Sequence, residues 1–215
     1  MTEKKPLIKL SVGEEIGNSV THGVMAMLML IALPIGAVLA YNRDGWILAL
    51  GISVFIISLF LMFLSSCLYH AMAYDSKHKS VMRILDHIFI YVAIAGSYTP
   101  VALSIIKGWQ GILILVVQWT MVLFGVLYKS LSKKSMPKAS VSIYLTMGWV
   151  AVFFMPTLIK TANPKFMILL ALGGIFYSVG AWFYSQKHRP YFHFIWHLFI
   201  NFAAISHFLA MLFYI

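Results

Sequence analysis

Seven long apolar segments, separated by short polar connections, constrain this chain more than any other feature of its sequence. Each segment is close to the roughly 20 residues that a helix needs to cross about 30 Å of hydrocarbon. We expect membrane-spanning helices over residues 20–40, 46–72, 84–106, 111–131, 141–159, 166–185 and 193–215. The sequence therefore predicts an all-α membrane protein with a cytoplasmic amino-terminal segment over residues 1–19 and one seven-helix transmembrane domain over residues 20–215. Six crossings is the alternative, if one connection is re-entrant.

The composition agrees with lipid as the main solvent. Only 10% of the 215 residues are charged and 61% are hydrophobic, whereas a soluble domain carries about 25% charged residues. The formal charge of +10 comes from basic residues that stand between the apolar segments, where they orient the chain and contact anionic lipid. We therefore expect membrane lipids as partners and no nucleic acid.

The Lys and Arg residues are distributed unevenly between the two sets of connections. The amino-terminal tail and the second, fourth and sixth connections hold Lys4, Lys5, Lys9, Lys77, Lys79, Arg83, Lys129, Lys133, Lys134, Lys138, Lys187 and Arg189. The other connections hold Arg43, Lys107, Lys160 and Lys165. Short cytoplasmic loops carry an excess of these residues. The distribution predicts a multi-pass protein of the cell inner (plasma) membrane, with its amino terminus in the cytoplasm and its carboxyl terminus outside.

Polar side chains gather at the ends of three of the predicted helices. His70 ends the second helix with Ser66 one turn earlier, Asp86 opens the third, and His193 and His197 open the seventh. Polar groups within a membrane are costly, so they usually face a protein interior or a cavity. In the predicted topology, all five residues lie at one depth near the cytoplasmic boundary.

Three imidazoles and a carboxylate at one depth predict a zinc site. Catalytic zinc commonly takes three protein ligands and a water, with Zn–N distances of about 2.0–2.1 Å. We expect His70, His193 and His197 to bind Zn²⁺, and Asp86 either to bind the metal or to hold and deprotonate its water. Ser66 would hydrogen-bond the water or an oxyanion. The plainer alternative is that the histidines contact headgroups and that Asp86 caps its helix.

A second polar cluster precedes the first predicted helix. Glu15, Asn18 and His22 follow one helical stripe, and Thr21 precedes His22. One interpretation is a polar helix start with capping hydrogen bonds. The other is that the stripe packs against the metal site, where it orients the ligands or relays protons.

Four motifs follow one another in a fixed order along the chain: Glu15-x-x-Asn18-x-x-Thr21-His22, Ser66-x-x-x-His70, Asp86 at the start of its helix, and His193-x-x-x-His197. In this order, from about residue 11 to the end, they resemble the hemolysin III family, the bacterial branch of the progestin and adipoQ receptor superfamily. The resemblance implies zinc near the cytoplasmic face, held by the three histidines, with the aspartate nearby through water and the serine beside them.

The same resemblance points to lipid chemistry. The wider superfamily is similar to alkaline ceramidases, which implies hydrolysis of a lipid amide or ester with a fatty-acyl substrate, and its bacterial members are linked to membrane fluidity. The alternative function is a non-catalytic membrane sensor or regulator in which zinc only joins helices. A retinal-binding proton pump is disfavoured, because residues 193–215 contain no lysine.

Overall fold

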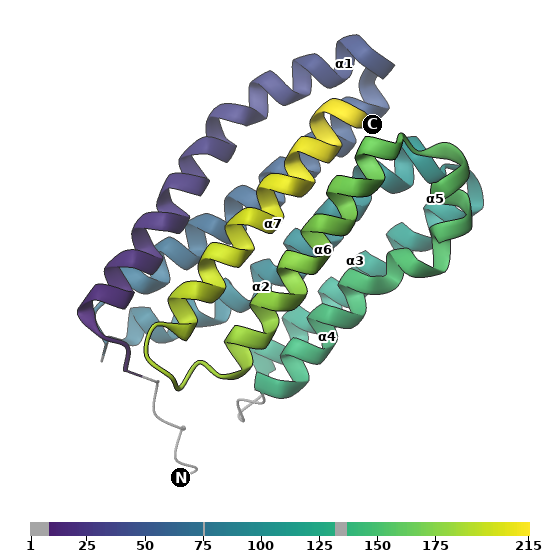
Figure 1. The fold of residues 1–215 in the computed structure, drawn as a ribbon. Coiled ribbons are helices and arrows are strands. Elements are labelled where there is room, and N and C mark those ends of the chain that lie inside the picture. The colour runs from purple at the N-terminus through teal and green to yellow at the C-terminus, as the bar shows by residue number, and fades with distance from the viewer. Residues whose placement is uncertain (1–8, 75, 132–136) are drawn as a thin grey trace.

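The computed structural model describes residues 9–74, 76–131 and 137–215, and within these ranges it is helical and contains no strand (Figure 1). The α-helices are α1 (Val12–Ala71), α2 (Lys77–Pro100), α3 (Gly108–Leu131), α4 (Pro137–Trp149), α5 (Met155–Thr161), α6 (Pro164–Ser185) and α7 (Phe192–Tyr214). A π-helical segment, Val101–Ile106, continues α2, and a 3-10 segment, Val150–Phe154, joins α4 to α5.

Six helices of the described residues are long and apolar enough to cross a membrane. They are α1, α2 with its π-helical continuation, α3, the helical stretch Ala139–Thr161, α6 and α7. Many large apolar side chains on them, including Leu123, Phe124 and Phe153, are exposed. Such a surface suits contact with lipid, and the prediction of an all-helical membrane protein is confirmed.

The helix α1 contains 60 residues, about three times the length that one crossing needs and therefore enough for two crossings. Its backbone leaves helical geometry at Asp44 and at Gly45, where the φ of 72° favours a glycine. Figure 1 shows α1 running to one end of the bundle, turning there and returning. The turn falls within the connection predicted at residues 41–45. Seven crossings, which require both arms of α1 to cross, stay a prediction.

The two arms of α1 form one side of the bundle, where α1 contacts both α2 and α7, and α6 packs along α7 (Figure 1). Phe55, Ile56 and Phe63 of the second arm are almost fully buried in the core. This packing brings the end of the second arm, the start of α2 and the start of α7 to the same end of the molecule. The predicted orientation of that end toward the cytoplasm stays a prediction, and Lys4, Lys5, Lys133 and Lys134, on which it partly depends, lie outside the described residues.

Candidate metal centre

Three histidine side chains converge where the second arm of α1 meets α7. Nε2 of His193 lies 3.3 Å from Nε2 of His70 and 3.2 Å from Nε2 of His197. The three offer ligand atoms that all lie within 4.8 Å of one another. Among the described residues, this histidine cluster is the group of His, Cys, Asp and Glu side chains with the spacing of a metal site.

The spacing of these nitrogens fits a tetrahedral metal ion. Ligand nitrogens at about 2.0–2.1 Å from a tetrahedral zinc lie about 3.3 Å from one another. Three Nε2 lone pairs facing one another repel unless a proton or a cation lies between them. His70 and His197 are buried and His193 is half-buried, which removes most of the water that would otherwise solvate these nitrogens. The histidine cluster therefore has the geometry and the donor set of a metal site with a position left open.

The start of α7 is fixed against the start of α1. His193 and His197 are four residues apart, so they project from one face of α7. The backbone N–H of Tyr191 donates to Oε1 of Glu14 at 2.7 Å. Glu14 also forms a capping box with Ser11, which closes the first turn of α1. The carboxylate of Glu14 thereby sets the position of α7 relative to α1, and with it the two α7 histidines relative to His70.

Glu15 holds the other nitrogen of His70. Oε2 of Glu15 lies 2.6 Å from Nδ1 of His70, and its Oε1 accepts a hydrogen bond of 2.7 Å from Nζ of Lys79. The ammonium of Lys79 is 2% exposed and donates also to the carbonyl of Met72. Metal-binding histidines usually donate their second N–H to a carboxylate, which orients the ring and raises its basicity. Glu15 therefore contacts His70 in this structure, and its role in orienting a metal ligand stays a prediction.

The remaining residues of the amino-terminal motif divide into two groups. Nδ2 of Asn18 lies 3.5 Å from Nδ1 of His70, and the ring of His22 lies over that of His197, with 3.9 Å between centroids. Both side chains are buried. The hydroxyl of Thr21 instead donates to the carbonyl of Gly17 within its own helix, so it serves local helix structure.

Asp86 and Ser66 lie beside the histidine cluster without joining it. Both side chains are buried and line one cavity together with His22. The carboxylate of Asp86 is not among the ligand atoms within 4.8 Å of one another. The hydroxyl of Ser66 lies close to the carboxylate of Asp86. This placement suits groups that act on a water or a substrate next to the metal.

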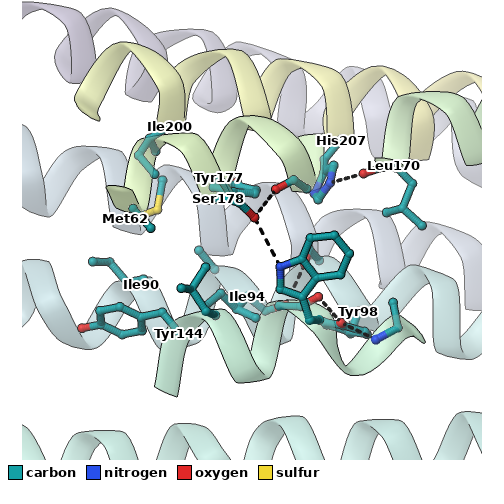
Figure 2. A pocket seen from close by; sticks show the side chains of 18 of the residues that line it. Met62, Ile90, Ile94, Tyr98, Tyr144, Leu170, Tyr177, Ser178, Ile200 and His207 are labelled. Atoms are coloured by element: carbon teal, nitrogen blue, oxygen red, sulfur yellow. Dashed lines mark hydrogen bonds between the residues drawn. The ribbon is translucent and has the colours of Figure 1, made fainter. Parts of the chain in front are cut away.

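The cavity that these polar groups line has a volume of about 200 Å³, and its lining is mostly apolar and aromatic, with Ser97, Ser178 and His207 as further polar residues. One stripe of its wall runs along α2 from Asp86 through Ile90 and Ile94 and ends at Val101, the first residue of the π-helical continuation. At a rise of about 1.5 Å per residue, this stripe is about 22 Å long. Figure 2 shows apolar and aromatic side chains of several helices, among them Met62, Ile90, Ile94 and Ile200, around the space. An elongated, mostly apolar cavity with a carboxylate at one end suits an acyl chain with a polar head.

The fold and the histidine cluster define a multi-pass helical membrane protein with a candidate metal centre at one end of its bundle. The family model described as haemolysin-III related matches residues 10–208, and the chain belongs to this family. The resemblance expected from the four motifs is confirmed.

Individual relatives cover nearly the whole chain. It is 37% identical over 204 residues to the hemolysin-3 homolog of Bacillus subtilis (strain 168), covering 95% of each chain. It is 36% identical over 215 residues to hemolysin-3 of Bacillus cereus, covering 100% of this chain and 98% of the relative. It is also 29% identical over 212 residues to the human monocyte to macrophage differentiation factor, covering 92% and 83%.

Two residues of the centre were not identified as site residues from the sequence. Lys79 counted only as a basic residue of a connection, because its partner Glu15 is 64 residues away in the chain. Glu14 follows Ser11 at the spacing of a capping box, which is a local signal, but its bond to Tyr191 spans 177 residues. Neither long-range contact leaves a pattern in a single sequence.

Proposed function

We propose that this protein is a zinc-dependent hydrolase that cleaves an amide or ester bond of a membrane lipid, and so takes part in membrane lipid and fluidity homeostasis. The observation that carries the proposal is the convergence of three imidazole nitrogens beside an apolar cavity whose polar end holds Asp86 and Ser66. A lipid carbonyl at that end would have its acyl chain in the cavity.

The histidine cluster would hold the metal, and Glu15 would keep the ring of His70 in the metal-binding tautomer. Zinc in such a site polarises a carbonyl and lowers the pKa of a water to about 7. Asp86 accepts the proton of the attacking water and returns it to the leaving nitrogen or oxygen as the carbonyl carbon–heteroatom bond breaks. The hydroxyl of Ser66 donates a hydrogen bond to the developing oxyanion. The apolar cavity excludes bulk water and positions the acyl chain.

The hydrolase proposal is tested by fatty-acid release from ceramide and other acyl lipids with purified, zinc-loaded protein. Asp86→Asn removes the base but no ligand of the histidine cluster, so we expect turnover to fall by about 10²–10⁴-fold while zinc stays bound. Asp44→Asn, the same change at an exposed residue of the α1 turn, serves as the matched control. It should keep both the turnover and the bound zinc of the wild type.

The second candidate is a non-catalytic sensor or regulator in which zinc only joins α1 to α7. It is favoured by one observation, the origin of the three histidines in these two packed helices. In that case Asp86→Asn leaves function intact, and His70→Ala lowers the unfolding temperature. Absence of metal-dependent fatty-acid release from every lipid assayed would contradict the hydrolase and leave this candidate.

A further inference from the structure

Three basic side chains from separate elements lie near one another at the end of the bundle that carries the candidate metal centre. Arg83 belongs to α2, Lys129 to the last turn of α3, and Lys187 to the connection between α6 and α7. Nζ of Lys187 donates to the hydroxyl of Tyr184, which lies 3.3 Å from Nε2 of His87, one turn after Arg83 on α2. Nζ of Lys129 donates to Ser140 of α4, one turn before Tyr144, whose hydroxyl donates to the carbonyl of His87. All three side chains are half-buried. We call this group the cation cluster.

Among the described residues, no carboxylate forms an ion pair with the cation cluster, and Asp86 acts on Lys129 and Lys187 only from a greater distance. The ion pairs among the described residues involve other cations, Lys79 and two histidines. Nζ of Lys187 donates to the hydroxyl of Tyr184 at 2.8 Å, and Nζ of Lys129 donates to a serine hydroxyl at 2.6 Å. The guanidinium of Arg83 makes no hydrogen bond within the described part of the chain. These hydroxyl partners carry no charge, so among the described residues three half-buried cations have one nearby carboxylate, that of Asp86.

The pKa of Lys187 reflects its partial burial beside another cation. It is lowered to about 8, first because burial disfavours the charged ammonium and then because Arg83 lies nearby, while Asp86 acts in the opposite direction. An anion bound among the three cations would replace the favourable interactions with water that burial removes, and it would reduce the repulsion between the cations. The cluster therefore has unused capacity for an anion.

The cation cluster adjoins the polar end of the cavity. Tyr184, which accepts the hydrogen bond of Lys187, also lies 3.3 Å from Nε2 of His87 through its hydroxyl. Tyr184 and Asp86 both line the cavity. A molecule with an anionic group among the cations and an apolar chain beside it would thus follow a continuous path from the end of the bundle into the apolar cavity.

We propose that the cation cluster binds the phosphate of an anionic phospholipid whose acyl chain enters the cavity. Phosphate oxygens accept charge-assisted hydrogen bonds from Arg and Lys, and basic pockets between transmembrane helices bind lipid headgroups. Inorganic phosphate offers the same oxygens, but it has no chain to fill the cavity. This binding site goes beyond the proposed hydrolysis, because it stands whether or not the lipid is cleaved.

The test is a titration of purified, zinc-loaded protein in an uncharged detergent with short-chain phosphatidylglycerol, followed by tryptophan fluorescence, since Trp149 and Trp196 line the cavity. The triple variant Arg83→Gln, Lys129→Gln, Lys187→Gln removes the three charges. We expect its affinity to fall on the order of a hundredfold, from three contributions of about one tenfold step or less each. Phosphatidylcholine of the same chain length should bind the wild type more weakly than phosphatidylglycerol.

The matched control is the triple variant Lys107→Gln, Lys160→Gln, Lys165→Gln, which removes three exposed cations away from the cluster and should bind like the wild type. An equal loss of phosphatidylglycerol affinity in both triple variants would overturn the proposal, and so would wild-type affinity in the variant that lacks the three charges of the cation cluster. So would equal binding of the two lipids, or displacement of phosphatidylglycerol by inorganic phosphate at the same concentration. Because the readout is binding, inactivity in the hydrolase assay does not change its outcome.

Discussion

The two ring nitrogens of His70 have different partners, and this difference determines what the histidine cluster can do. A carboxylate only accepts hydrogen bonds, so the contact of 2.6 Å with Glu15 places the proton of His70 on Nδ1. Nε2, which faces His193 at 3.3 Å, then keeps its lone pair for a metal. Lys79 holds the other oxygen of Glu15 and keeps that carboxylate charged and oriented.

Replacing Glu15 by glutamine should weaken metal binding without removing a ligand. The amide keeps the shape of the side chain but loses the charge that raises the basicity of His70, and it leaves Lys79 without its carboxylate. We expect metal affinity to fall by about 10–100-fold, measured by competition with a chelator of known affinity. Asp44→Asn controls for a change of charge elsewhere, and unchanged affinity in Glu15→Gln would show that the contact does not tune the site.

Part of this site was predictable from the sequence, because the spacing of His193 and His197 and the depth of His70 follow from helix periodicity and span boundaries alone. The contact between Glu15 and His70 was open to two interpretations, since a stripe of polar residues looks the same whether it caps a helix or packs against a site. The buried position of Lys79 could not be predicted. Only the packing of α1 on α2 brings its ammonium to Glu15.

At the scale of elements, the lengths of the apolar segments predicted the positions of the helices well. The observed helix ends differ from the predicted ones where polar residues extend or interrupt a helix. The predicted third helix begins at residue 84, whereas α2 begins at Lys77. The polar turn between them is helical because Ser76 caps it and Lys79 finds partners inside the protein. Conversely, the polar connection at residues 41–45 interrupts α1 only at Asp44 and Gly45.

The close approach of α1 and α2 depends on a missing side chain. A methyl group at Gly51 of α1 would lie 2.8 Å from Cα of Pro100, and a backbone atom cannot move aside as a side-chain tip can. Gly51→Ala should destabilise the protein by about 1–3 kcal/mol, measured by thermal unfolding in detergent. Gly148→Ala is the control, because nothing lies within 4 Å of the added methyl. Equal unfolding temperatures for both variants would contradict this packing.

For the whole molecule, the functional account requires that both arms of α1 cross the membrane. The number of crossings is then odd, so the two termini lie on opposite sides of the membrane. The amino terminus, the candidate metal centre and the cation cluster lie in the cytoplasmic half, and the carboxyl terminus lies outside. The asymmetry of Lys and Arg predicts this arrangement, whereas the helical fold alone is compatible with either orientation.

Cysteine labelling decides the orientation. In a Cys67→Ala background, Asn42→Cys and Lys160→Cys should react with a membrane-impermeant maleimide in intact cells, because both exposed positions are predicted outside. His188→Cys, also exposed, should react only after the membrane is permeabilised. Labelling of His188→Cys in intact cells, with Asn42→Cys protected, would reverse the predicted topology.

The central claim, that the imidazoles of α1 and α7 share one metal ion, is tested most directly by the zinc content of the purified protein. The account predicts about one zinc per chain in the wild type and in the control His188→Ala, which changes an exposed histidine. His193→Ala and His197→Ala should each lose most of this zinc. A wild type without stoichiometric metal, or full zinc content in both α7 variants, would contradict the account.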